Sequence, residues 1–163
     1  AFVAVPEVSS EGREYVPIAF FDKDVVPTNK IQVIENAGHQ IFGVLCSRAF
    51  SVWVDAISGR LESRYSISSE ITYNNFPFPD LSTDKGTGIK DAASEVLAAR
   101  NSFPNSSLAD LYDPMAMPSE LRKAHQHLDK AVLSAFDLKA SASDEQVLAK
   151  LFHRYEELTR GLV

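Results

Sequence analysis

The spacing of apolar residues along the chain changes twice, and this change most constrains the fold. Over residues 39–57 apolar side chains recur every three or four positions, which is typical of one face of a helix. Over residues 65–73 they alternate with polar side chains, which indicates a half-buried strand. Helical spacing then returns and continues toward the C-terminus. The pattern predicts an α+β segment at residues 1–79 followed by a small all-α segment at residues 80–163.

The other expected elements are shorter. The polar segment 6–14 is expected to form a turn between the first two β-rich runs. Proline and serine at the starts of the later helical patterns favour helix entry there. The expected strands lie at residues 1–5, 15–21 and 31–34, and the expected helices at residues 89–101, 119–136 and from 143 onward.

Composition excludes several classes of protein. With 163 residues, 45% hydrophobic and 23% charged, the chain resembles an ordinary soluble globular protein. No apolar run is long enough to span a bilayer, so we expect no membrane partner. The start, AFVAV, has no Met and no basic region, so we expect the interior of a longer protein rather than a signal peptide. A single cysteine, Cys46, excludes an internal disulfide, predicts a buried thiol and suits the reducing cytoplasm.

The net charge of −6 argues against a free-standing nucleic-acid-binding domain, because such domains are usually basic. There are six basic against nine acidic residues up to Asn75, and ten against thirteen after it. Neither part is a basic module. Any contact with DNA is therefore expected to come from a local patch, with further phosphate contacts supplied elsewhere in a longer protein.

One charged pair has the chemistry of base recognition. Glu62 can accept a hydrogen bond from the exocyclic amine of cytosine, and Arg64 can donate two to guanine. If the segment is extended, residues two apart point to the same face, so both side chains could approach one C·G pair. The alternative is an exposed salt bridge at a strand entrance, which contributes about 0–1 kcal/mol. Spacing alone favours the salt bridge.

Several nearby residues are candidates for contacts with the DNA backbone. Arg48 and Arg60 flank the pair, and Ser66 follows it. Lys23 and Lys30 lie upstream. All of these also fit solvated surface positions, which need no functional explanation.

Neither a metal centre nor a catalytic centre is predicted. His125, His127 and Asp129 form an HxHxD string, but helical residues two apart point in nearly opposite directions. The two imidazoles therefore cannot share an ion. The sequence contains no Ser-His-Asp arrangement, no glycine-rich phosphate loop and no S-adenosylmethionine-binding glycine motif.

Blocks of sequence in a fixed order carry a family resemblance. The blocks are VPEVSSE and REYVPI near the start, FGVLCSR, GRL with a tyrosine four residues later, YNNFP, and then SLADLYDP and LDKAV. In this order they resemble the C-terminal part of the MmeI-like enzymes, single-chain type II restriction-modification proteins. These enzymes fuse an endonuclease, a DNA adenine methyltransferase, a target recognition domain and a small helical tail.

The resemblance implies roles that spacing alone does not give. It implies that residues 1–79 are the C-terminal half of a target recognition domain of mixed α/β type, and that residues 80–163 are the helical domain. It implies that the variable triplet after Gly-Arg-Leu carries specificity, which assigns base recognition to Glu62 and Arg64. Ser66 stands where the family commonly has arginine.

The resemblance also implies partners for the longer protein. These are double-stranded DNA, a methyltransferase domain upstream in the same chain, S-adenosylmethionine as methyl donor to adenine N6, and Mg²⁺ if a nuclease is active. We expect no cofactor and no catalytic residue in these 163 residues. A longer protein that only methylates DNA is one alternative. An interaction module that docks a protein partner without contacting DNA is another, and the acidic net charge favours it.

Overall fold

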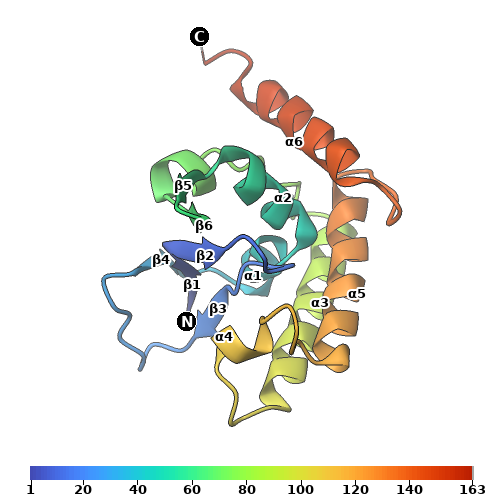
Figure 1. Ribbon diagram of the computed structural model, residues 1–163. Helices are drawn as coiled ribbons and strands as arrows, with labels where there is room; N and C mark the ends of the chain where they lie inside the picture. The colour runs from blue at the N-terminus through green and yellow to red at the C-terminus, as the bar shows by residue number, and fades with distance from the viewer. Residues whose placement is uncertain (163) are drawn as a thin grey trace.

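The computed structural model describes residues 1–162 and shows two small sheets followed by helices (Figure 1). This arrangement confirms the α+β class and the helical character of the second half. The strands and helices, in chain order, are β1 (Phe2–Pro6), β2 (Val8–Ser10), β3 (Ala19–Phe21), β4 (Ile31–Glu35), α1 (His39–Leu45), α2 (Arg48–Ile57), β5 (Gly59–Leu61), β6 (Arg64–Ser66), the π-helical turn η1 (Ser69–Tyr73), α3 (Asp84–Asn101), α4 (Leu108–Leu111), α5 (Ser119–Ala135) and α6 (Asp144–Thr159).

Both sheets are antiparallel and have three strands. The first has the order β3-β1-β4, with Val3 opposite Phe20 on one side and Ile34 on the other. The second has the order β2-β6-β5, with Ser9 opposite Tyr65. The expectation that residues 6–14 form only a turn was wrong, because β2 lies within them. A polar sequence suffices there, since β2 needs only backbone pairing with β6 and buries a single residue.

The prediction of helix over residues 39–57 is confirmed, but the prediction of one continuous helix was wrong. The chain bends by 55° between α1 and α2. At the bend Ser47 is extended, and its hydroxyl donates a 2.7 Å hydrogen bond back to the carbonyl of Val44. The bend presents the first backbone N–H of α2, that of Arg48, to the carboxylate of Asp129 on α5 at 2.8 Å. A helix N-terminus is stabilised by such an acceptor, because its first N–H groups have no partner within the helix.

The strand expected over residues 65–73 was also wrong. Only its beginning belongs to β6, and the chain then forms η1. Trp53 on α2 donates its indole N–H to the carbonyl of Thr72 at 2.9 Å, and the side chain of Asn75 donates to the carbonyls of Glu70 and Ile71. These contacts satisfy backbone groups that a strand would have paired with a neighbouring strand.

The helices of the second half agree with the sequence pattern. Helix α3 begins earlier than expected, at Asp84, and α5 follows Pro118 as its N-cap residue. Helix α6 has a reciprocal capping box in which Ser143 and Gln146 each accept from the other's backbone N–H.

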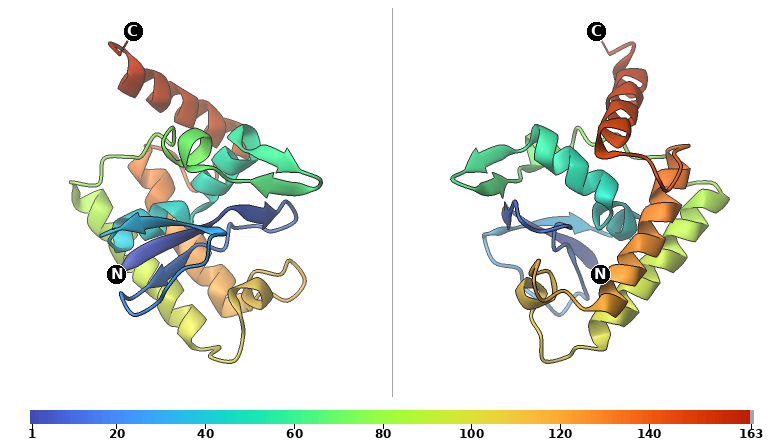
Figure 2. Two further views of the ribbon diagram at one scale, coloured as in Figure 1. Left: turned by 90° about the vertical axis from the view of Figure 1, so that its left-hand side faces the viewer. Right: turned by 45° about the vertical axis from the view of Figure 1, so that its right-hand side comes forward.

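The two halves share one core. Helices α1, α3 and α5 pack together, with Phe42, Leu45, Ile89 and Leu128 fully buried among them. Gly43 marks the closest approach, because a Cβ there would lie 2.9 Å from Ile89 and 3.2 Å from Leu128. Residues 1–79 and residues 80–162 are therefore packed around one shared core rather than joined by a loose linker. Figure 2 shows β5 and β6 projecting from this core, away from α3 and α5.

Candidate nucleic-acid interface

The projecting feature is a β-hairpin made by β5 and β6. Helix α2 ends at Ile57, and β5 begins two residues later, so the hairpin leaves the helix directly. A two-residue turn, Glu62-Ser63, joins the strands, with Leu61 opposite Arg64. Glu62 has φ 57°, a left-handed conformation that is uncommon outside glycine but suits the first position of a tight hairpin turn. The turn therefore displays a charged side chain where many hairpins have glycine.

The structure brings the two predicted base-recognition residues together. Nη2 of Arg64 lies 3.1 Å from Oε2 of Glu62, and the side chains are 46% and 79% exposed. The sequence alternative of an exposed salt bridge is thus what the unbound chain contains. An exposed ion pair contributes at most about 1 kcal/mol, so it is easily exchanged for other partners. The pair presents one acceptor group and one forked donor at the tip of the hairpin.

Arg60 has its charge engaged within the chain. Its Nη2 donates to the carboxylate of Asp55 at 2.9 Å, its Nη1 lies 3.3 Å from Glu11, and its guanidinium covers the ring of Tyr65 at 4.3 Å. The hydrogen bond to Asp55 raises the pKa of the Arg60 guanidinium. Contact with a DNA phosphate would require Arg60 to give up some of these partners.

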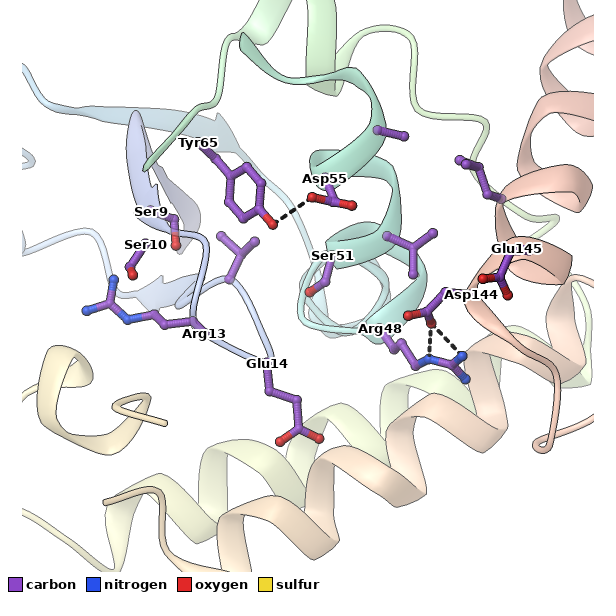
Figure 3. A pocket seen from close by; sticks show the side chains of 14 residues that line it. Ser9, Ser10, Arg13, Glu14, Arg48, Ser51, Asp55, Tyr65, Asp144 and Glu145 are labelled. Carbon is purple, nitrogen blue, oxygen red and sulfur yellow. Dashed lines mark hydrogen bonds and ion pairs between the residues drawn. The ribbon is translucent and has the colours of Figure 1, made fainter. Parts of the chain in front are cut away.

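Tyr65 and Asp55 complete this contact at the base of the hairpin. The phenol of Tyr65 donates a 2.9 Å hydrogen bond to Oδ1 of Asp55 (Figure 3). The same oxygen accepts from Arg60. Burial raises the pKa of the Tyr65 phenol, and the bond to Asp55 raises it further. Asp55 carries no motif that marks it in the sequence. Its only signal was its position on the last turn of a helix leading directly into the hairpin.

Arg48 lies at the start of α2 and faces the helical half. Its guanidinium bonds to Asp144 at the start of α6 (Figure 3). It also donates a 2.9 Å hydrogen bond to the carbonyl of Ala142. Ser66 is exposed on β6, between Val8 and Gly59 in the sheet. The structure therefore places Arg60, Ser66 and the Glu62–Arg64 pair on one hairpin, and it places Arg48 at the far end of α2.

A groove of about 560 Å³ runs between β2, α2 and α6 beside the hairpin (Figure 3). Arg13 and Arg48 line it, but so do four carboxylates, those of Glu14, Asp55, Asp144 and Glu145. This excess of negative charge does not favour a nucleic-acid backbone in the groove. The tip of the hairpin is the better candidate for contact with DNA.

A buried polar network anchors α2 to the helical half. Asp129 accepts from the Arg48 backbone and, at 2.8 Å, from the phenol of Tyr15. Desolvation raises the pKa of Asp129 from 3.8 to about 6. The sequence reasoning set Asp129 aside together with the HxHxD string, and nothing in that string signals its capping role.

The histidines of the string point in different directions. His125 is fully buried, stacks on Tyr15 and lies 2.5 Å from the hydroxyl of Tyr112. Arg100 donates to the same hydroxyl, so the Tyr112 proton is directed to Nε2 of His125. Burial lowers the pKa of His125 from 6.5 to about 3. His127 is exposed and pairs with Glu95 at 2.6 Å. Within residues 1–162 no three His, Cys, Asp or Glu side chains are arranged to hold a metal ion.

Among residues 1–162 no single helix is both long and apolar enough to cross a bilayer, and only the bent pair α1 and α2 passes that test in combination.

Two family models match the chain along its length. Residues 1–80 match the MmeI target recognition domain, and residues 82–163 match the MmeI C-terminal domain. The chain belongs to the MmeI family, as the sequence resemblance predicted.

Two similar proteins are much longer than this chain. DNA methyltransferase A of Bacillus subtilis (strain 168) is 41% identical over 157 residues, which make up 96% of this chain and 18% of that protein. The structure of the Type IIL restriction-modification enzyme MmeI in complex with DNA matches with a TM-score of 0.91 and 43% identity, over 98% of this chain and 21% of that chain. The chain thus spans about a fifth of the length of either relative.

Proposed function

We propose that this chain is the DNA-recognition portion of a longer S-adenosylmethionine-dependent DNA methyltransferase of the restriction-modification type. The observation that carries the proposal is the exposed acceptor and donor pair, Glu62 and Arg64, displayed on a hairpin that projects from the packed core. The similarity to a DNA methyltransferase and to MmeI bound to DNA supports it. The fragment contributes recognition, and the chemistry belongs to other parts of the longer protein.

The hairpin is proposed to enter the major groove with its tip toward one base pair. There Glu62 accepts from the exocyclic amine of cytosine and Arg64 donates to O6 and N7 of guanine. A two-stranded ribbon fits the width of the major groove. The ion pair between the two side chains costs little to open, since both are exposed.

Backbone contacts are proposed for Ser66 and, once released from their present partners, for Arg60 and Arg48. Ser66 needs no rearrangement, because it is already exposed on β6. Residues 1–79 are proposed to be the recognition unit, and residues 80–163 the unit that braces it. The shared core around Gly43 and the contact between Asp129 and α2 support this bracing role.

The reaction, its methyl donor and its metal ion are proposed for the longer protein. We propose methyl transfer to adenine N6, with S-adenosylmethionine bound in a methyltransferase domain of the same chain, and Mg²⁺ only where a nuclease is active. The cytoplasm is the proposed location. The single thiol, that of Cys46, is buried and free in the structure, and free thiols suit a reducing compartment.

Salt-dependent binding of the full-length protein to duplex DNA tests the function. A protein that contacts phosphates loses affinity steeply as salt rises, and we expect that behaviour here. Arg64→Ala should weaken the preference for one base pair by about 1–3 kcal/mol and leave the salt slope nearly unchanged.

The chain offers a matched control. Lys85 and Asp137 form an exposed ion pair in the helical half, with side chains 42% and 71% exposed. Lys85→Ala should leave base preference unchanged. Absence of any DNA retention at low salt would contradict the proposal and favour the alternative, an interaction module that docks a protein through its acidic surface.

A further inference from the structure

One carboxylate holds both strands of the hairpin. Oδ1 of Asp55 accepts from Arg60 on β5 and from Tyr65 on β6, each at 2.9 Å. Arg60 and Tyr65 are directly opposite each other in the hairpin register, and the Arg60 guanidinium lies over the Tyr65 ring at 4.3 Å. A single side chain of α2 therefore binds a cross-strand pair, not one strand only.

The helix that carries Asp55 is itself fixed. Its inner face buries Phe50, Trp53 and Val54 in the shared core. The Trp53 indole is bonded to the carbonyl of Thr72, and the N-terminus of the helix is bonded to Asp129. Because α2 is fixed in the core, the bonds from Asp55 to Arg60 and Tyr65 fix the hairpin relative to the core.

The other contacts that orient the hairpin are longer or involve only backbone pairing: Arg60 lies 3.3 Å from Glu11 and 3.3 Å from the backbone carbonyl of Asp55, and β6 pairs with β2. Within residues 1–162, β5 is an edge strand that pairs with β6 alone, and all three of its residues are exposed. On the other side, β6 pairs with three residues of β2. A sheet of such short strands depends on packing against a helix for its stability, and Asp55 provides a contact of this kind from α2. Glu62 lies two residues beyond Arg60, and Arg64 immediately precedes Tyr65.

We infer that Asp55 is a positioning residue that aligns Glu62 and Arg64 for base recognition by clamping Arg60 and Tyr65 to α2. The inference rests on the function proposed above. Recognition of a base edge requires placement within about 0.5 Å and 10–20°. Without the Asp55 carboxylate, Glu62 and Arg64 are still present, but the hairpin no longer holds them in the orientation that base recognition needs.

The test uses the full-length protein and measures methylation rates on duplexes that differ at the single base pair recognised by Glu62 and Arg64. Asp55→Ala should reduce the ratio of rates on cognate and substituted duplexes by about tenfold. Asp55→Asn retains an oxygen acceptor for Arg60 and Tyr65, so the ratio should fall by less than about threefold. Asp91→Ala, at an exposed position on α3, is the matched control and should leave the ratio unchanged.

Thermal unfolding separates positioning from general stability. The Asp55 side chain is 63% exposed, so its removal should lower Tm little. If Asp55→Ala nevertheless fails to fold, Tyr65→Phe carries the test, because it removes one bond to Asp55 and keeps the ring under Arg60. Its ratio should fall by about threefold.

The failures are distinguishable. One outcome is that Glu62→Ala and Arg64→Ala abolish the preference for one base pair, whereas Asp55→Ala and Tyr65→Phe keep the full ratio of rates or lower the rates on cognate and substituted duplexes equally. In that case the positioning role of Asp55 is overturned and the proposed function stands. If Glu62→Ala and Arg64→Ala also keep the preference, the proposed function itself fails.

Discussion

Arg64 and Glu62 face each other across the end of a two-residue turn, with 3.1 Å between Nη2 and Oε2. The left-handed backbone at Glu62 makes this proximity possible, because it closes the turn within two residues. The result is an acceptor and a forked donor at the same end of a projecting hairpin. Such a pair is matched to the acceptor and donor groups that one C·G pair presents in the major groove.

Exchanging the donor and acceptor should change the base that is preferred. In the double variant Glu62→Lys with Arg64→Asp, a donor replaces the acceptor and an acceptor replaces the donor. Competition binding with duplexes carrying each of the four pairs at this position should show a shift from C toward G on the same strand, by about 1–3 kcal/mol. The same exchange at Lys85 and Asp137 should have no effect. An unchanged order of preference in the hairpin variant would contradict the assignment.

The contact between the two halves should be sensitive to a single methyl group. Gly43→Ala places a Cβ 2.9 Å from Ile89 and 3.0 Å from Ala93, closer than van der Waals contact allows. We expect the free energy of unfolding to fall by about 1–3 kcal/mol in urea denaturation. Gly88→Ala, where a Cβ would meet nothing within 4 Å, is the control and should not destabilise α3. Equal stability of the two variants would show that the halves pack less tightly than described.

The pH dependence of stability should reveal two opposing groups. The pKa of Asp129 is raised from 3.8 to about 6 by burial, so its contribution to stability is lost as pH rises through this range. The pKa of His125 is lowered from 6.5 to about 3 by burial, so its contribution is lost as pH falls through that range. Between pH 4 and pH 6 the two effects largely cancel.

Asp129→Asn should remove one of these effects and keep the hydrogen bonds. The amide oxygen can accept from the Arg48 N–H, and the amide nitrogen can donate to the Tyr15 hydroxyl. Relative to the unsubstituted protein, the variant should then lose on the order of 1 kcal/mol per pH unit as pH falls from about 6 to 4. Urea denaturation at three pH values measures this, with the exposed Asp91→Asn as control. A pH-independent difference would show that Asp129 ionises normally.

The parts of the fold that local chemistry determines could be predicted from the sequence. Helix α6 is an example, because Ser143 and Gln146 form its cap within four residues. The strand predicted over residues 65–73 failed because its backbone groups bond to side chains, those of Ser68 and Asn75 nearby and that of Trp53, 19 residues before Thr72, which an alternating pattern does not reveal. The acceptor that caps α2 after the break, Asp129, is 81 residues away from Arg48, so the local sequence does not reveal it.

Some residues of the candidate site could likewise be predicted from the local sequence, and others could not. Glu62 and Arg64 could be singled out, since their side-chain chemistry and their place after Gly-Arg-Leu are both visible in the sequence. Asp55 could not, because its importance comes from the register that sets Arg60 opposite Tyr65. A sequence pattern does not specify that register when the strands are only three residues long.

The most direct test of the account is methylation-site mapping of the full-length protein with Glu62→Ala and, separately, Arg64→Ala. The account predicts that each variant relaxes or shifts the preference at one base pair of the recognition sequence and leaves the other positions unchanged, at a cost of about 1–3 kcal/mol in discrimination. A recognition sequence that is identical for both variants and the unsubstituted protein would contradict it.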